Sequence, residues 1–357
     1  MGPNGPRPTC STTEFESVIC RYMINTKLLQ DSYTYFETEL GLLAYTYGKQ
    51  ARYNDEKMVC SIVGYFTKKP TNRLQTATGR FIEKLMYEGN EGNLDFDEHL
   101  VSLPKSIKKQ LKRYTLVDQN SGERLLIIPV QDVVKVYSPR ESLREIVNES
   151  SKIDSKRRKA ILKLITLLQR YNIKIGDLGL YGSLQIGVAN KSDKVDIDLL
   201  IFGIENYSKL QILTEQQNYK LNVDSKYKSI REFLPWKKAR QCRDSCSKIF
   251  IDEKSHADIK IVRKQNDPIS FDFQNLELER ESFAAKGVVL DSNQGLSTPS
   301  VFKVQIAEQI YTVGTRIYVY IGAAKEGNTV VIKGRKIKGK NAILVANAKD
   351  NFIYPIY

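Results

Sequence analysis

Two aspartates separated by one residue, Asp196 and Asp198, lie inside the apolar run "KVDIDLLIF", which predicts a buried β-strand. Side chains on a strand alternate between its two faces, so both carboxylates project to one side and Val195, Ile197 and Leu199 to the other. Two adjacent like charges repel and are costly to bury unless a cation joins them. Carboxylate oxygens at this spacing suit Mg²⁺ or Mn²⁺. The pair therefore predicts a divalent-metal site.

Gly182 and Ser183 come before that strand, where the short strand "DLGLY" gives way to an expected short helix, "SLQIGVAN". Glycine lets the backbone approach a ligand closely. The free N–H groups at a helix start, together with a serine hydroxyl, form an anion site. An anion site followed twelve residues later by a metal site is the combination that a metal-bound triphosphate needs.

A third carboxylate is expected from a later strand, "HADIKIV". Asp258 lies on the strand face opposite Ile259 and Ile261, and it shares that face with His256 and Lys260. We expect Asp258 to hold a second metal or to accept a proton from an attacking hydroxyl group. Lys260 is expected to contact a phosphate of the nucleotide.

Two cysteines, Cys242 and Cys246, are four residues apart in an expected helix and would share a face. The chain has only two histidines, His99 and His256, and no second close pair of cysteines to complete four zinc ligands. Five cysteines at irregular spacing also do not form a disulfide framework. We therefore expect the thiols to be structural and buried.

The elements around the carboxylates alternate between strands and helices, which predicts a small α/β domain with a mixed sheet. Its clearest helix falls in residues 151–170, where Ile161, Leu164 and Leu168 recur at helical spacing. Short strands divided by Gly, Asn and Pro come before this domain, and short apolar–polar alternations come after it.

The expected organisation has four parts: a disordered tail (1–15), an N-terminal mixed α/β domain (16–150), the domain that carries the carboxylates (151–294) and a small β-barrel-like domain (295–357).

The charge of the chain favours an anionic partner. Its 55 Lys and Arg exceed its 41 Asp and Glu, giving a net charge of +14. Nucleic acid or nucleotide is favoured over membrane, because no basic helix with an aromatic face stands out. The basic residues concentrate in segments 151–170, 220–248 and 315–340. An ordinary solvated surface is the alternative interpretation of each segment.

No part of the sequence predicts a membrane protein. No apolar run approaches the roughly 18 residues of a spanning helix, and the start, "MGPNGPRPTCSTTEF", lacks the apolar region of a signal peptide. We therefore expect a cytoplasmic protein with no membrane partner. The sequence assigns no oligomeric state.

The stretch "YGSLQIGVANKSDKVDIDLLIF" resembles the signature of the DNA polymerase β-like nucleotidyltransferase superfamily: a Gly-Ser pair, a spacer, then two acids separated by one apolar residue. The resemblance implies an α+β fold with a polymerase β-like core. It also implies that Gly182 and Ser183 bind the triphosphate, while Asp196, Asp198 and Asp258 hold two Mg²⁺ or Mn²⁺ ions.

A wider resemblance links "IVGYFTKKPTNRL", "IPVQDVVKVYSPRESL" and "STPSVFKV" to a prokaryotic family of predicted, largely uncharacterised nucleotidyltransferases. It implies an N-terminal β-rich α+β domain before the core and a small β domain after it. The chain lacks the extensive fingers and thumb of larger polymerases, which argues against processive synthesis.

Three functions remain open from the sequence. The first is transfer of a nucleoside monophosphate from an NTP to a hydroxyl acceptor with release of pyrophosphate, the acceptor being nucleic acid and an RNA 3′ end favoured over DNA. The second is a nucleic-acid-binding protein with an inactive core, which uses the terminal β domain. The third is transfer of a nucleotide to a protein or a small molecule.

The second function would use the basic and aromatic residues of the terminal domain, namely Lys333, Arg335, Lys336, Lys338 and Lys340 with Tyr318 and Tyr320.

Overall fold

The structure is a computed structural model. It describes residues 28–29, 32–39, 41–47, 52–53, 58–67, 74–75, 81–84, 105–117, 124–149, 153–187, 194–216, 235–264, 266–267, 271, 276–315, 317, 320–346 and 351–356. The expected tail at 1–15 lies outside these residues.

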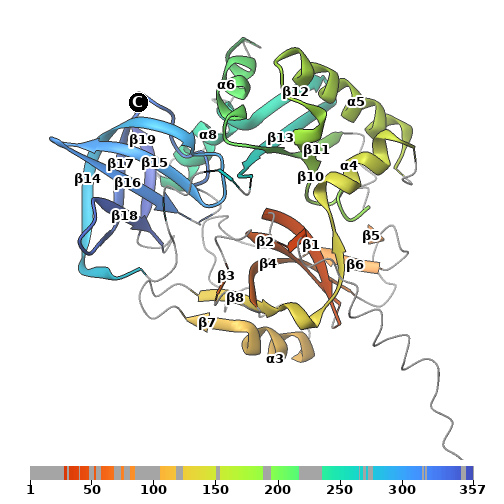
Figure 1. Ribbon diagram of the computed structural model, residues 1–357, viewed down its shortest axis with the longest axis horizontal. Helices are drawn as coiled ribbons and strands as arrows, with labels where there is room; N and C mark the ends of the chain where they lie inside the picture. The colour runs from red at the N-terminus through yellow and green to blue at the C-terminus, as the bar shows by residue number, and fades with distance from the viewer. Residues whose placement is uncertain are drawn as a thin grey trace, which may run out of the picture.

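The described residues have an α+β fold, with three separate sheets and few helices. The N-terminal sheet lies below the central sheet in Figure 1, and a barrel of strands lies beside both. The described part of the N-terminal region contains strands β1 (Ser32–Thr38), β2 (Leu42–Tyr47), β3 (Arg52–Tyr53), β4 (Met58–Thr67), β5 (Leu74–Gln75), β6 (Phe81–Lys84), β7 (Thr115–Val117), β8 (Arg124–Pro129) and β9 (Val133–Tyr137), with helix α3 (Lys105–Tyr114).

The N-terminal sheet has the order β5-β6-β4-β2-β1-β9, and β8 joins β4 to β7. Strand β1 lies between β2 and β9 and is antiparallel to both. Its register shifts between Ser32 and Tyr35, which marks a bulge there. Every residue of β1 is buried, because the strand is covered on both faces.

The central sheet has four strands, ordered β10 (Leu178–Leu180), β11 (Val195–Phe202), β13 (Ser255–Val262) and β12 (Lys248–Asp252). Strands β11 and β13 are parallel, and each outer strand is antiparallel to its neighbour. The helices of this part are α4 (Pro139–Val147), α5 (Ser155–Arg170), α6 (Asn206–Gln216) and α8 (Pro235–Ser247).

All four helices pack on one face of the central sheet. The buried cluster on that face joins Leu143 of α4, Leu164 of α5, Leu210 of α6 and Cys246 of α8 to Ile197 of β11 and its neighbours. Both predicted buried cysteines, Cys242 and Cys246, belong to this cluster and are free thiols. The opposite face of the sheet therefore carries the polar residues of β11 and β13.

Local sequence explains where the helices begin. Ser138 caps α4 by accepting a hydrogen bond from the backbone of Glu141, and Pro139 occupies the first turn. Asp154 caps α5 in the same way through the backbone N–H of Arg157, at 2.9 Å. A cap of this kind contributes about 1 kcal/mol to helix stability.

The C-terminal sheet closes on itself. Its order is β14 (Leu278–Gln294), β15 (Ser300–Ile306), β16 (Gln309–Thr315), β18 (Ala342–Val345), β17 (Thr329–Ile337) and β19 (Phe352–Ile356). Because β14 also pairs with β17, the first five strands form a barrel, and β19 extends β17. Strand β14 begins at Leu278, ahead of the boundary drawn at residue 295, because its first half already pairs along β17.

Two local expectations differ from the structure. Residues 182–187 form turns and no helix, because Gly182 and Gly187 take positive φ angles of 68° and 72° that interrupt a right-handed helix. The apolar–polar alternation of "RIYVYIG" (316–322) also predicts a short strand, but its described residues, Ile317 and 320–322, lie outside strands.

Candidate functional site

The two aspartates of β11 and the aspartate of β13 share one face of the central sheet. The register of the parallel pair matches Asp196 with His256, Asp198 with Asp258, and Leu200 with Lys260. Adjacent strands lie about 4.8 Å apart, so Asp198 and Asp258 are direct neighbours. The site is thus a ladder of three cross-strand pairs on the face that the helices leave uncovered.

Gly182 lies directly against the carboxylate of Asp198. A Cβ atom placed on Gly182 would overlap Asp198 Oδ2. The preceding residue fixes this approach, because the backbone N–H of Tyr181 donates to the carbonyl oxygen of Asp198 at 3.1 Å. Ser183 follows in the turn and is half-buried. The predicted Gly-Ser pair is therefore brought to the first carboxylate strand.

Asp258 is oriented by the end of helix α8. The hydroxyl of Ser247 donates to Asp258 Oδ1 at 3.2 Å and shares its proton with the carbonyl oxygen of Arg243 at 2.9 Å, and Ser247 itself is fully buried. Lys248, the next residue, pairs with Asp258 in the antiparallel register of β12 and β13. Its ammonium group turns back to Asp244 at 2.9 Å. One carboxylate oxygen of Asp258 is thus held by a buried hydroxyl group.

Asp196 lies at the exposed end of the ladder, with its side chain 64% accessible. Its Oδ1 atom is 3.2 Å from Nε2 of His256. The His256 ring lies 6.1 Å from the ring of Phe250 on the neighbouring strand. Solvent therefore reaches Asp196, in contrast to Asp198, which is half-buried.

Lys260 lies at the buried end of the ladder and is only 5% exposed. Its ammonium group lies 4.4 Å from the ring centre of Tyr33 and 4.3 Å from that of Tyr181. Burial lowers the pKa of this lysine to about 7, although the charges of Asp258 and Asp198 act to raise it. The two carboxylates, together with the two rings, offset part of the cost of burying this cation.

Tyr33 comes from the N-terminal sheet and closes the site from the opposite side. It takes a positive φ of 62°, at the bulge in β1, which is strained for a bulky residue. Its ring stacks on Tyr45 at 5.7 Å, and its hydroxyl group bonds to the hydroxyl of Thr298, which lies between β14 and β15 of the barrel. One side chain therefore contacts all three parts of the chain.

Four of the predicted site residues lie together, namely Gly182, Asp198, Asp258 and Lys260. Asp196 lies beside them but contacts His256, and Ser183 follows Gly182 in the turn. Among the described residues, no group of three or more His, Cys, Asp or Glu side chains converges as a metal site. The carboxylates share a face without meeting at one point.

Two site residues were missed from the sequence. Ser247 lies in a segment noted only for its basic charge and its two cysteines, and Tyr33 lies in the N-terminal sheet. Ser247 directly precedes strand β12, so pairing of that strand with β13 would have pointed to it. No sequence pattern indicates that Tyr33 reaches Lys260.

Comparison with known proteins gives one distant relative. The chain is 24% identical over 250 residues to the uncharacterized protein MJ1086 of Methanocaldococcus jannaschii. The matched region covers 65% of this chain and 71% of the relative. No family model matches the chain, and no solved structure matches it. No helix in the described ranges is long and apolar enough to span a membrane.

Proposed function

We propose that the protein is a nucleotidyltransferase that uses divalent metal ions. It transfers a nucleoside monophosphate from an NTP to a hydroxyl group, and the favoured acceptor is an RNA 3′ end. The observation that supports this proposal best is the pairing of Asp198 with Asp258 on adjacent parallel strands. Gly182 lies against one member of the pair and Lys260 lies one step further along the same face.

The residues fit a divalent cation by their donor chemistry. Asp198 and Asp258 offer hard oxygen ligands from neighbouring strands, which Mg²⁺ and Mn²⁺ prefer. Asp196 would be the third ligand, and its exposure leaves it accessible although His256 occupies one oxygen. Bound there, the metal ions would neutralise the phosphates and the leaving pyrophosphate.

The protein's own residues have distinct roles in this reaction. Gly182 lets the backbone of the turn lie directly against Asp198, since the Cβ atom of any larger residue would overlap that carboxylate. Lys260 attracts the negative charge of the phosphates. The attacking hydroxyl oxygen bonds to the α-phosphorus, the bond to the bridging oxygen breaks, and the hydroxyl proton passes to Asp258. Ser247 keeps Asp258 in the orientation that this proton transfer needs.

The test is to incubate the purified full chain with Mg²⁺ or Mn²⁺, each labelled NTP, and RNA, DNA or protein acceptors. Transfer of label to RNA is expected. Asp198→Asn and Asp258→Asn should each lower the rate by about 100-fold or more. Asp252→Asn is the matched control, because Asp252 is an aspartate of the same sheet that pairs with Lys163 away from the ladder.

Absence of transfer with every acceptor would contradict the proposal, as would an unchanged rate in Asp198→Asn. Transfer of label to protein alone would show that the acceptor is a protein and not RNA. RNA binding without any transfer would favour a nucleic-acid-binding protein with an inactive core.

A further inference from the structure

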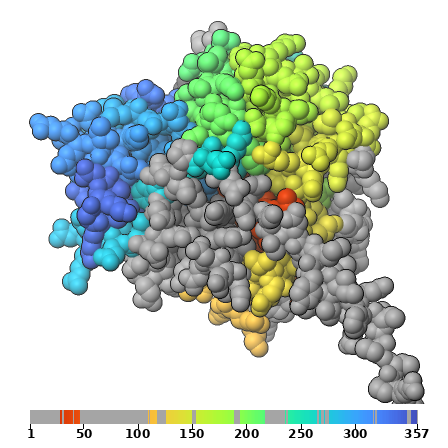
Figure 2. All heavy atoms as spheres, in the orientation of Figure 1, coloured from red at the N-terminus to blue at the C-terminus, as the bar shows by residue number. Residues whose placement is uncertain are grey.

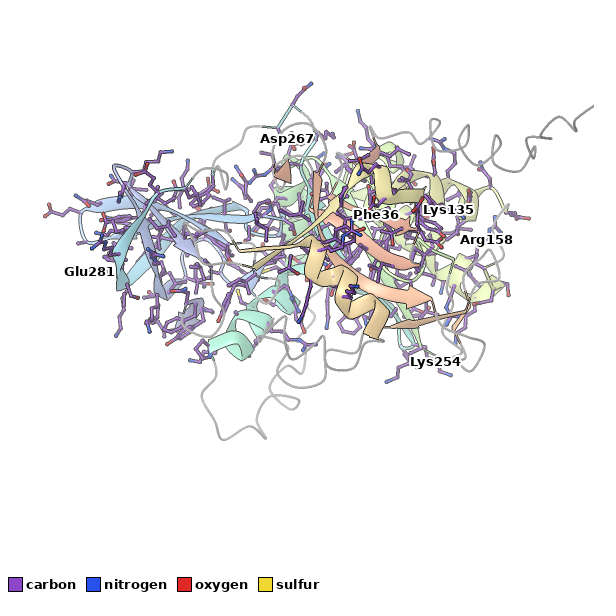
Figure 3. The ribbon with its side chains drawn as sticks, turned by 90° about the horizontal axis from the view of Figure 1, so that it is seen from below. Phe36, Lys135, Arg158, Lys254, Asp267 and Glu281 are labelled. Atoms are coloured by element: carbon purple, nitrogen blue, oxygen red, sulfur yellow. The ribbon has the colours of Figure 1, made fainter. Side chains whose placement is uncertain are left out.

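The three basic segments differ in how their charges are used. On α5, Arg158 pairs with Glu149 at 2.7 Å and Lys163 with Asp252 at 3.2 Å, while Arg157 pairs with its own cap residue. Figure 3 shows Arg158 and Lys254 at the end of the molecule away from the barrel. Much of the charge on α5 is therefore already balanced by carboxylates of this chain.

Two cations of the second segment are balanced in a similar way. Arg243 of α8 and Lys248 at the start of β12 both lie within 4 Å of Asp244. Arg243 is also buried, at 6% exposed. Residues 220–234 of this segment lie outside the described residues. Arg243 and Lys248 are therefore engaged by a carboxylate of this chain.

Several residues expected to bind strands on the barrel are engaged or buried. Lys338 pairs with Glu277 at 3.5 Å. Lys336 lies over the rings of Phe283 and Tyr311, at 4.2 and 5.4 Å. Tyr320 is buried at 2% exposed and forms part of the barrel core, and Tyr318 lies outside the described residues.

Lys333 occupies the middle of a row that crosses three strands. It pairs with Ala284 of β14 on one side and with Phe352 of β19 on the other. Ala284 is exposed and small, so it leaves one flank of Lys333 open, and Phe352 is half-buried. The Phe352 ring contacts that of Tyr354 at 5.4 Å. Lys333 and Phe352 are thus cross-strand neighbours that are both half-buried, and Phe352 also packs against the barrel core.

Lys286 adds a second cation to the same face. It is exposed and pairs with Val331, two residues from Lys333. The two lysines are therefore diagonal neighbours, with roughly 7–8 Å between their backbones. In the described part of the chain, neither lysine has a carboxylate within 4 Å. The barrel forms one side of the molecule in the space-filling view (Figure 2).

We propose that this outer face of the barrel, formed by Lys286, Lys333 and Phe352, binds single-stranded nucleic acid. The two cations contact successive phosphates, and the Phe352 ring stacks on a base. Stacking and phosphate contacts read no sequence, so the surface binds strands of any base composition. That this surface holds the acceptor of the transfer rests on the proposed function. That it binds single-stranded nucleic acid does not.

The experiment measures binding of a fluorescent single-stranded RNA to the full chain, without NTP or metal, at several salt concentrations. Lys286→Gln/Lys333→Gln should lower the slope of log affinity against log salt by about 1.4, or about 0.7 for each lost phosphate contact. Phe352→Leu should weaken binding by about fivefold, with little change in the salt slope.

The matched control is Lys163→Gln/Lys209→Gln, which removes the same charge from lysines that contact Asp252 and Asn206 on the central domain. Melting temperatures of all variants check that the barrel stays folded. Absence of RNA binding by the wild-type chain would overturn the proposal, as would an equal loss in control and test variants. Binding by the inactive Asp198→Asn chain would separate this result from the proposed function.

Discussion

Gly182 and Asp198 are in contact across the turn that follows β10, so closely that no side chain fits between them. The contact links the two halves of the sequence signature, which are twelve residues apart along the chain. It also explains why glycine is needed there for two reasons, since Gly182 has a positive φ of 68° as well.

Gly182→Ala should therefore abolish nucleotide transfer. The new methyl group overlaps the Asp198 carboxylate, and the positive φ costs a further 1–2 kcal/mol or so. A transfer assay combined with thermal unfolding measures both effects. Gly176→Ala is the control, because Gly176 has no atom near its added methyl group and no positive φ. Equal activity in the two variants would contradict the assigned contact.

Removal of the Ser247 hydroxyl group should slow transfer by about tenfold or more, because a hydrogen bond to a charged group contributes about 1.5–3 kcal/mol. Ser247→Ala leaves Asp258 without its fixed donor. The control is Ser245→Ala on the same helix, which removes a hydroxyl that donates to the Cys242 carbonyl oxygen at 2.7 Å and lies 3.9 Å from Cys246 Sγ. Steady-state rates should fall in the first variant and stay near wild type in the second.

Two substitutions of Tyr33 distinguish the contribution of its ring from that of its hydroxyl group. Tyr33→Phe keeps the ring over Lys260 and loses the bond to Thr298. Tyr33→Leu loses the ring. We therefore expect the KM for NTP to rise several-fold in Tyr33→Leu but to change little in Tyr33→Phe. An amine-reactive acylating reagent should also modify Lys260 faster in Tyr33→Leu than in Tyr33→Phe, as measured by mass spectrometry. Equal KM values and labelling rates would argue against a positioning role.

The ion pair between Glu205 and Lys264, at 2.6 Å, predicts a defined pH dependence of stability. The bond to Lys264 lowers the pKa of Glu205 against the opposing effect of burial, and it raises the pKa of Lys264. The carboxylate therefore stabilises the fold above its ordinary pKa of 4.5, and that stability is lost as the pH falls below this value.

Glu205→Gln should lower the free energy of unfolding by less than about 1 kcal/mol at neutral pH, since both side chains are partly exposed. The difference from wild type should vanish towards pH 3. Urea unfolding at a series of pH values measures it. A difference that stays constant down to acid pH would show that the ion pair is not its source.

The strand and helix positions around the site followed from the sequence because they depend on local patterns. The alternation in "KVDIDLLIF" predicts β11 with both aspartates on one face, and the helical spacing of Ile161, Leu164 and Leu168 predicts α5. The strand around Asp258 is confirmed as β13, with His256 and Lys260 on the face of Asp258. Periodicity fixes which face a residue takes, and tertiary packing does not alter it.

The features that did not follow from the sequence depend on contacts between distant residues. A helix after Gly182 was the local expectation, but the approach of Gly182 to Asp198 requires turns instead. The ion pairs of the basic segments also depend on the fold, because they join distant residues such as Lys163 and Asp252. Charge counts along a segment cannot distinguish a paired lysine from an available one.

The arrangement of all four helices on one face of the central sheet makes the N-terminal sheet its second cover. Leu200, Phe202 and Val262 lie on the ladder face and are buried under Tyr33 and Tyr181. A fragment that begins near residue 151 would leave these apolar side chains in water, and Lys260 would lose one of its rings. The carboxylate domain is therefore not a separable module: shortening the chain to its signature region should yield an aggregating fragment rather than a minimal enzyme.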